Sequence, residues 1–349
     1  MPIPRTFFNP IYLIIFSNTA SIFVLYLTPS TVYRNYFPMT LDLFMKIMIT
    51  ILLGFTIAFL IKKISLKKPV ENNFIISSRL RLRFFNIIFL SWLGISIIET
   101  IYAGGLPSLI LFGIPSPPVS NFGIPLVHGF AQSLFYFLFT LLTFESIYSK
   151  KTNWKLWILI IWALLLFARG TLIVMVLIGF FSMIYSSNKN VKLNLRFLVL
   201  LSLLIYLFVW IGDNRSDFQD IGQSSGLTNV FRPLIWFYSY TATPWVNLSL
   251  TVDTGSYILV NSMFNTLTGF YPAYYWGGEV GLYIGSLLIG LLSGYLHNDN
   301  NLRLVPFKII FSATSALLFF GTFLLNLGFI LCLMLSYLLS SVTYVKETD

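Results

Sequence analysis

Long apolar runs recur along the whole chain, and they constrain its fold more than any other feature. A run of about 17–25 apolar residues is long enough to cross the hydrocarbon core of a bilayer. Only 10% of the 349 residues are charged, whereas a soluble globular domain is about 25% charged. The sequence therefore predicts an all-α polytopic membrane protein, with residues 1–349 forming a single integral-membrane domain.

The apolar runs predict about ten transmembrane helices. They cover residues 11–28, 41–62, 84–103, 127–148, 154–168, 171–187, 195–211, 278–296, 305–321 and 324–343. The stretch 229–276 is apolar in patches and could form a re-entrant helical pair or cross twice, which would give twelve crossings. Both alternatives leave the two termini on the same side of the membrane.

The distribution of cations orients this topology. If the N-terminus is cytoplasmic, 17 of the 22 Lys and Arg residues fall on the cytoplasmic side, in the short segments between spans. This bias predicts a multi-pass protein with both termini inside. The net charge of +10 is spread over these loops, so membrane lipids are expected partners and nucleic acid is not. The cations predicted on the outer side are Arg34, Arg169, Arg215 and Arg232. Lys46 lies just inside the second predicted span and can extend its ammonium group to the outer surface.

One polar stretch stands out, and we expect residues 212–277 to form an outer loop or re-entrant segment at the face of an active site. It begins GDNRSDFQD and holds Arg215 and Arg232 among acids and aromatics. Together with Arg169, which lies between two short spans, these arginines suit a diphosphate, because the planar guanidinium donates two parallel hydrogen bonds to phosphate oxygens. The alternative is that each arginine reaches the interface alone or pairs with a nearby acid.

Glu99 and His128 lie near the outer ends of the third and fourth predicted spans. A carboxylate at such a position is either a site residue or a structural partner for an outer arginine. His128 is either a site residue or a hydrogen-bonded interface residue. Further candidates for substrate binding are polar and aromatic residues of the 212–277 stretch, which otherwise fit an aromatic belt at the interface. They are Asp213, Asp217, Tyr238, Tyr240, Trp245 and Asn247.

No metal or cofactor is expected. The chain has no Gly-rich phosphate loop, no paired-cysteine site and no His-Glu-x-x-His motif. The acids Asp213, Asp217 and Asp220 come close to a calcium loop, but Arg215 stands where such a loop needs a ligand. Small residues at Gly281/Gly285 and Gly290/Gly294 predict a close helix–helix contact and carry no chemistry.

The order of several segments resembles the oligosaccharide repeat unit polymerases, the Wzy-type O-antigen polymerases. These segments are IETIYAGGLPSL with FGIPLVHG, then FARGTL between short spans, then GDNRSDF with WFYSYTATPWVNL, then a Gly-rich span. The resemblance lies in pattern and spacing and covers roughly residues 84–296. It implies a GT-C-like helical fold in the bacterial inner membrane with a periplasmic active site.

The resemblance also implies an activity. Such an enzyme transfers the growing glycan from undecaprenyl diphosphate to an incoming repeat unit, so donor and acceptor are both undecaprenyl-diphosphate-linked oligosaccharides. The family's arginines for the diphosphate would correspond to Arg169, Arg215 and Arg232, and a chain-length regulator protein is a further expected partner. Two alternatives stay open: a flippase of lipid-linked oligosaccharides, and an O-antigen ligase, although the large outer loop here lacks the histidine that ligases use.

Overall fold

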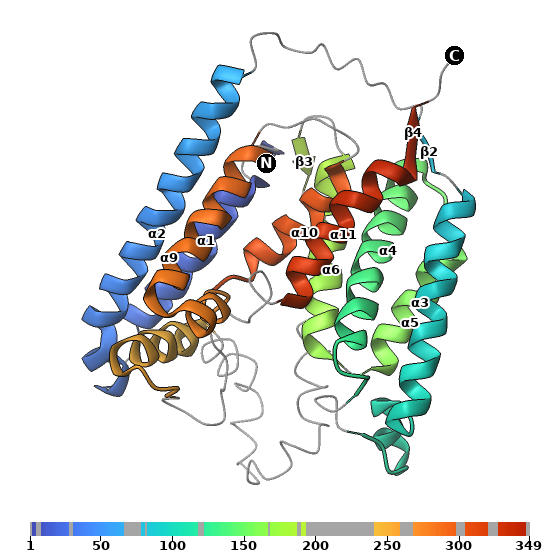
Figure 1. Cartoon of the computed structure of the whole chain (residues 1–349), viewed down its shortest axis with the longest axis horizontal. Helices are drawn as coiled ribbons and strands as arrows, with labels where there is room; N and C mark the ends of the chain where they lie inside the picture. Colours follow the sequence, from blue (N-terminus) through green and yellow to red (C-terminus); the bar gives the residue numbers. More distant parts are fainter. Residues whose placement is uncertain are drawn as a thin grey trace.

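The computed structural model of the chain is a bundle of helices (Figure 1). It describes residues 2–4, 8–27, 31–65, 78–80, 82–117, 122–166, 168–186, 190–192, 241–258, 268–297, 304–319 and 327–346. The labelled helices are α1 (Pro10–Tyr26), α2 (Thr31–Ser65), α3 (Leu82–Ala103), α4 (Val127–Ser149), α5 (Trp154–Leu165), α6 (Arg169–Ser186), α9 (Tyr271–Leu296), α10 (Val305–Ala316) and α11 (Leu327–Thr343). The short elements are the 3₁₀ helix η2 (Pro107–Phe112) and the strands β1 (Pro2–Pro4), β2 (Ser78–Leu80), β3 (Asn190–Lys192) and β4 (Tyr344–Lys346).

Each predicted span that falls within the described residues contains a helix, and the span predicted at 195–211 lies outside them. Among the described helices, four are long and apolar enough to cross a bilayer: Asn35–Lys63, Arg83–Ala103, Val127–Ser149 and Tyr271–Leu296. The other apolar helices are shorter; α5 and α10, with 12 residues each, extend only about 18 Å. The architecture is that of a helical membrane protein, and the ten crossings and the GT-C-like fold stay predictions.

Two helices begin well ahead of their predicted starts. Helix α2 begins at Thr31, ahead of the predicted start at 41, and contains Pro38. Helix α9 begins at Tyr271, ahead of the predicted start at 278, because a kink at Gly277 and Gly278 joins two helical pieces. Gly278 has φ 58° and ψ −148°, a conformation open essentially only to glycine. In both cases the helix begins ahead of the apolar run that predicted it.

Helix α10 joins two groups of helices. Helices α1, α2 and α9 pack against one another, whereas α3, α5, α6 and α11 each pack against α4; α10 contacts α1, α4, α6 and α11. All residues of α10 from Val305 to Ser315 are buried. A helix buried on every side is expected in the centre of a bundle, and α10 holds that position.

The closest helix contact joins α2 and α9, whose backbones touch through glycines. A Cβ added at Gly290 would clash with the Ile51 carbonyl oxygen, and one at Gly294 would lie 2.5 Å from the Phe55 carbonyl oxygen. Gly54 approaches α9 in the same way, because a Cβ there would lie 3.1 Å from the Leu291 nitrogen. The predicted structural role of Gly290 and Gly294 is confirmed, whereas Gly281 faces the Ala273 carbonyl of its own helix.

The four strands form two antiparallel ribbons at one end of the bundle. Strand β1 pairs with β3, and β2 pairs with β4. Both ribbons lie at the end where α2 finishes and α3 begins (Figure 1). We call this the strand end and the opposite end, where α3 finishes and α4 and α6 begin, the pocket end. Strand β1, near the start of the chain, and strand β4, near its end, therefore lie at the same end of the bundle. An even number of membrane crossings, such as the predicted ten, would give this arrangement.

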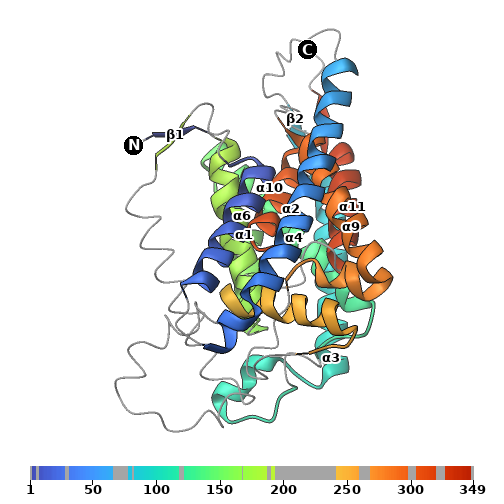
Figure 2. The same ribbon diagram turned by 90° about the vertical axis from the view of Figure 1, so that its left-hand side faces the viewer.

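The helix over residues 241–254 lies across the bundle and not along it. Figures 1 and 2 both show this segment crossing α2 and α9 near the start of α9. All its residues from 241 to 251 are buried. Ser21 of α1 donates to the Thr241 carbonyl oxygen, and the hydroxyls of Thr40 and Ser249 lie 2.8 Å apart. Short helical pieces at membrane depth are tolerated where protein surrounds them. Here α1 and α2 surround the helix through these contacts.

At the strand end, His297 ties α1, α2 and α9 together. Its Nδ1 lies 2.8 Å from Asn9 Nδ2, and the rings of Phe55 and Phe59 pack edge-on against the imidazole. Lys62 Nζ donates to the carbonyl oxygens of Tyr295 and His297 at 2.8 and 2.9 Å, which places a cation at the carbonyl end of α9. The polar residues that follow it, Asn298, Asp299 and Asn300, predict a solvated His297, and these contacts show that this prediction is wrong.

We expect the stability of the protein to fall as the pH drops below about 6.5, through His297. Burial, with the Lys62 charge second, lowers the pKa of His297 from its ordinary 6.5. The folded state thus binds fewer protons than the unfolded state, so this contribution is complete above pH 6.5 and is lost as the pH falls toward the lowered pKa. His297→Gln should flatten that part of the profile. Thermal unfolding in detergent at several pH values measures it, and identical pH dependence in both proteins would contradict the assignment.

Candidate functional site

At the pocket end, the end of α3 and the start of α4 bring two ionisable side chains into contact. Glu99 is only 1% exposed. His128 Nδ1 lies 3.2 Å from Glu99 Oε1 and 3.3 Å from Oε2. A buried carboxylate without a partner is costly, so the histidine explains how α3 keeps an acid inside an otherwise apolar sequence.

A tight turn ahead of α4 holds this pair in place. The Ile124 N–H donates to Glu99 Oε1 at 3.3 Å. Gly123 has φ +97°, and a Cβ there would lie 2.6 Å from His128 Nδ1 and 2.8 Å from Glu99 Oε1. The Phe122 ring packs edge-on against the imidazole with centroids 5.8 Å apart. Only glycine fits between the two side chains, and the turn therefore fixes both their separation and the orientation of the imidazole.

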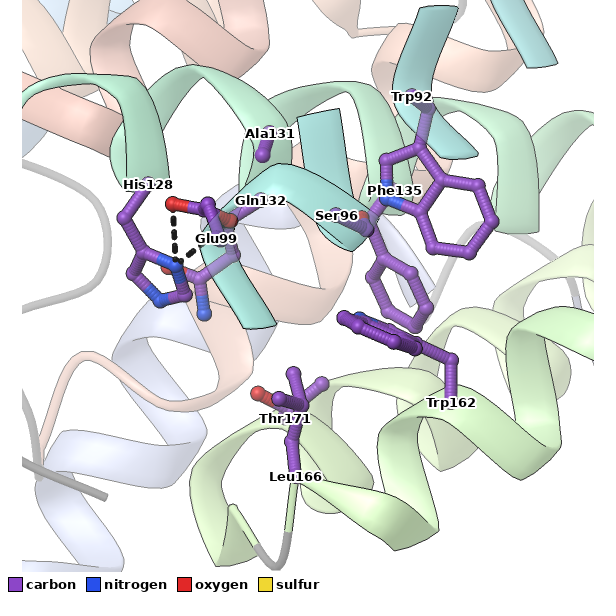
Figure 3. Close-up of a pocket in the computed structure, with 10 residues that line it drawn as sticks. All are labelled: Trp92, Ser96, Glu99, His128, Ala131, Gln132, Phe135, Trp162, Leu166 and Thr171. Carbon is purple, nitrogen blue, oxygen red and sulfur yellow. Dashed lines mark hydrogen bonds and ion pairs between the residues drawn. The ribbon is translucent and has the colours of Figure 1, made fainter. Parts of the chain in front are cut away.

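The pair opens into a pocket between α3, α4, α5 and the start of α6 (Figure 3). The space inside measures about 20 Å³, which is enough for about one water molecule. Three large aromatic side chains form one wall: Trp92 packs against Phe135 and Trp162, with ring centroids 5.9 and 6.0 Å apart. The full lining is Trp92, Ser96, Glu99, His128, Ala131, Gln132, Phe135, Trp162, Leu166 and Thr171. The pocket is apolar at one side and polar around Glu99.

A chain of hydrogen bonds runs from the pocket to the start of α6. Gln132 Nε2 donates to the Tyr136 hydroxyl at 3.4 Å, and that hydroxyl donates to Thr171 Oγ1 at 3.3 Å. Thr171 is 5% exposed. This chain anchors the first turn of α6 to α4, and so fixes where the residues at that turn lie relative to Glu99 and His128.

The structure describes the position of some predicted site residues, and the others lie outside the described residues. Glu99 and His128 line one pocket. Arg169 is the first residue of α6, and its neighbours in the chain, Leu166 and Thr171, line the same pocket. The remaining predicted residues with no described position are Arg215, Arg232, Asp213, Asp217, Tyr238 and Tyr240.

Trp245 and Asn247, which the sequence assigns to substrate binding, lie in the crosswise helix and are both 0% exposed. The Trp245 ring packs against Phe44 and Phe270, with centroids 5.4 and 5.7 Å apart. A sugar could stack on this indole only by displacing one of these rings. Their position therefore favours packing over sugar contact.

Several pocket residues were missed in the sequence, although helical spacing could have found them. Ser96 precedes Glu99 by three residues on α3, and Gln132 follows His128 by four residues on α4. Residues at these spacings share one face of a helix. Thr171 and Trp162 carry no such signal, because they reach the pocket only through the packing of α5 and α6.

Within the described part of the chain, no group of three His, Cys, Asp or Glu residues comes together as a metal site would require. The acids Asp213, Asp217 and Asp220 lie outside the described residues. The expectation of metal-independent chemistry therefore remains a prediction. Comparisons with protein-family models, with curated proteins and with solved structures gave no significant match to this chain.

Proposed function

We propose that the chain is a metal-independent glycosyltransferase of the O-antigen polymerase type in the bacterial inner membrane. It would transfer the growing glycan from undecaprenyl diphosphate to an incoming undecaprenyl-diphosphate-linked repeat unit. The observation that carries this proposal is the pocket at one end of an apolar helical bundle, where a buried acid–histidine pair faces the start of the helix that begins with Arg169. A reaction between two lipid-linked substrates requires such a site at a membrane surface.

The start of α6 supports a role in diphosphate binding. The first backbone N–H groups of a helix lack partners within the helix and carry a partial positive charge, which favours anions. An arginine at that position gains nothing from the helix dipole, since cations are stabilised at the opposite end. Arg169 at this turn is therefore better explained by an anion that both the amides and the guanidinium bind. Arg215 and Arg232 would complete the clamp.

The proposed orientation places the strand end in the cytoplasm and the pocket in the periplasm. Described cations gather at the strand end: Lys62 and Lys63 close α2, Lys150 and Lys151 follow α4, and Lys192 lies in β3. Short cytoplasmic segments rich in Lys are typical of inner-membrane proteins. A periplasmic pocket would receive repeat units after their transfer across the membrane, and the isoprenoid chains of both substrates would stay in the bilayer.

Deleting the gene tests the proposal in the native host. The lipopolysaccharide of the deletion strain should carry a single repeat unit and lose the ladder of longer chains, and the intact gene should restore that ladder. Gel separation of extracted lipopolysaccharide measures this. Loss of every repeat unit would point to a flippase, because no unit would then reach the periplasm. An unchanged ladder would exclude both activities.

A further inference from the structure

We propose that Glu99 and His128 form a proton-accepting dyad, in which His128 Nε2 takes the proton of the acceptor hydroxyl and Glu99 positions the imidazole. This inference rests on the proposed function, and it assigns the proton transfer that the reaction requires. The arginines stabilise the leaving diphosphate and, being permanently protonated, cannot accept that proton. Among the described residues that line the pocket, His128 is the accessible side chain that can do so.

The contacts of Glu99 select the histidine tautomer. A carboxylate accepts hydrogen bonds, so the proton between the two groups belongs on His128 Nδ1, which lies 3.2 and 3.3 Å from the two Glu99 oxygens. The Ile124 N–H donates to the same carboxylate. With Nδ1 protonated, the neutral imidazole presents Nε2 as an acceptor. None of the described residues hydrogen-bonds to that nitrogen.

The two side chains differ in exposure. A base must be accessible to the substrate, whereas the residue that positions it can be buried. The His128 side chain is 34% exposed, whereas that of Glu99 is 2% exposed. Figure 3 shows the imidazole at the edge of the pocket, with Nδ1 directed at Glu99 and the second ring nitrogen directed away from it. A substrate can therefore reach His128 and not Glu99. A salt bridge that served packing alone would not need one accessible partner.

The surroundings also restrain the ring. Phe122 packs on its edge, and Gly123 lies so close that a Cβ would fall 2.6 Å from Nδ1. A base that is already held in position loses less conformational entropy on reaching the transition state, which lowers the barrier. The imidazolium that forms after proton transfer lies beside the Glu99 carboxylate, which stabilises its charge.

The step balances as follows. The oxygen of an acceptor sugar hydroxyl forms a bond to the anomeric carbon of the donor glycan, and the bond from that carbon to the diphosphate oxygen breaks. The leaving undecaprenyl diphosphate keeps the electron pair. The hydroxyl proton passes to His128 Nε2, giving an imidazolium held by Glu99, and then leaves to water. No metal, oxidant or further reactant takes part.

Two substitutions separate proton transfer from folding. His128→Asn retains a donor near the Nδ1 position for Glu99 but has no group equivalent to Nε2. General acid–base groups contribute about 10²–10⁴-fold, so we expect kcat to fall by about that factor with KM unchanged. Glu99→Gln should lower kcat in the same range, also with KM unchanged, because a neutral amide neither fixes the tautomer nor stabilises the imidazolium. The assay uses purified protein and lipid-linked repeat units extracted from the deletion strain.

Chemical rescue gives the second readout. His128→Ala leaves space at the pocket, and added imidazole should restore part of its activity, as a base that the protein no longer supplies. Glu99→Gln, which keeps His128 in place, should not respond to imidazole. His297→Ala is the matched control: it removes the other histidine of the chain, at the strand end, and its rate should not rise with imidazole.

The outcomes distinguish the dyad from the proposed function. If the unsubstituted protein makes no polymer from these substrates, the proposed function fails and the dyad with it. If it makes polymer and His128→Asn retains at least a third of its kcat, the dyad is wrong and the polymerase proposal stands. Active parent protein, a large loss of kcat in both variants and rescue of His128→Ala alone would establish the dyad.

Discussion

Replacing Arg169 with lysine is expected to lower the rate of repeat-unit polymerisation by about 10²–10³-fold, nearly as much as replacing it with alanine. Lysine keeps the charge but loses the planar fork that donates two hydrogen bonds to one phosphate group. Under the proposed function this contact would strengthen as charge develops on the leaving diphosphate, so its loss would raise the energy of the transition state. Arg169 opens α6 between two pocket-lining residues, Leu166 and Thr171, where the bond to the diphosphate would break.

The test uses single lysine and alanine variants at Arg169, Arg215 and Arg232. For each variant, the length of the lipopolysaccharide ladder is measured and compared with the amount of the variant in the membrane. Arg34 is the internal control, since the sequence gives it no role beyond reaching the interface, and Arg34→Lys should make normal ladders. Lysine variants that match the parent at all three site positions would show that these arginines serve only as topological anchors.

Enlarging Gly290 is expected to separate α2 from α9 and destabilise the fold. A Cβ at this position would clash with the Ile51 carbonyl oxygen and lie 2.9 Å from the Phe55 nitrogen. Backbone on the opposite helix cannot rotate away as a side chain can. We therefore expect Gly290→Ala to lower the free energy of unfolding by about 1–3 kcal/mol, and Gly290→Leu to prevent recovery of folded protein from the membrane.

Two other helical glycines provide the control for Gly290. A Cβ at Gly94 in α3 or Gly179 in α6 would meet nothing within 4 Å. Replacing either with alanine should be neutral or stabilise the protein by up to about 1 kcal/mol, because alanine favours the helix over glycine. Thermal unfolding in detergent compares the three variants. A Gly290→Ala protein as stable as the two controls would contradict the close backbone contact.

The helical character of the chain follows from the sequence because each apolar run satisfies its backbone only as a helix inside a membrane. The same logic predicted α4 at 127–148, and the helix runs from Val127 to Ser149. Hydropathy does not fix helix lengths, because it detects the apolar segment and not the residues where the helix begins and ends. Helix α2 therefore begins at Thr31, ahead of its apolar run. Helix α9 begins at Tyr271, because the kink at Gly277 and Gly278 joins an earlier helical piece to the apolar one.

The candidate site was only partly accessible to sequence reasoning. Topology alone places Glu99 and His128 at the same end of the bundle, since both lie at outer ends of neighbouring predicted spans. Their direct contact depends on the turn at Gly123, whose φ of +97° the sequence does not specify. The sequence makes Trp245 a candidate for stacking on a sugar, with an aromatic belt at the interface as the alternative, yet its ring is 0% exposed. Burial of the crosswise helix depends on long-range packing that no local pattern encodes.

The most direct test of the account reconstitutes the purified protein in lipid vesicles with lipid-linked repeat units in both leaflets, in the presence of a strong chelator. Chain length and movement of labelled units between leaflets are measured in the same sample. The account predicts glycans of several repeat units on undecaprenyl diphosphate, no exchange of units between leaflets, and polymer formation about 10²–10⁴-fold slower with His128→Asn. Single units that cross the bilayer without lengthening would contradict it.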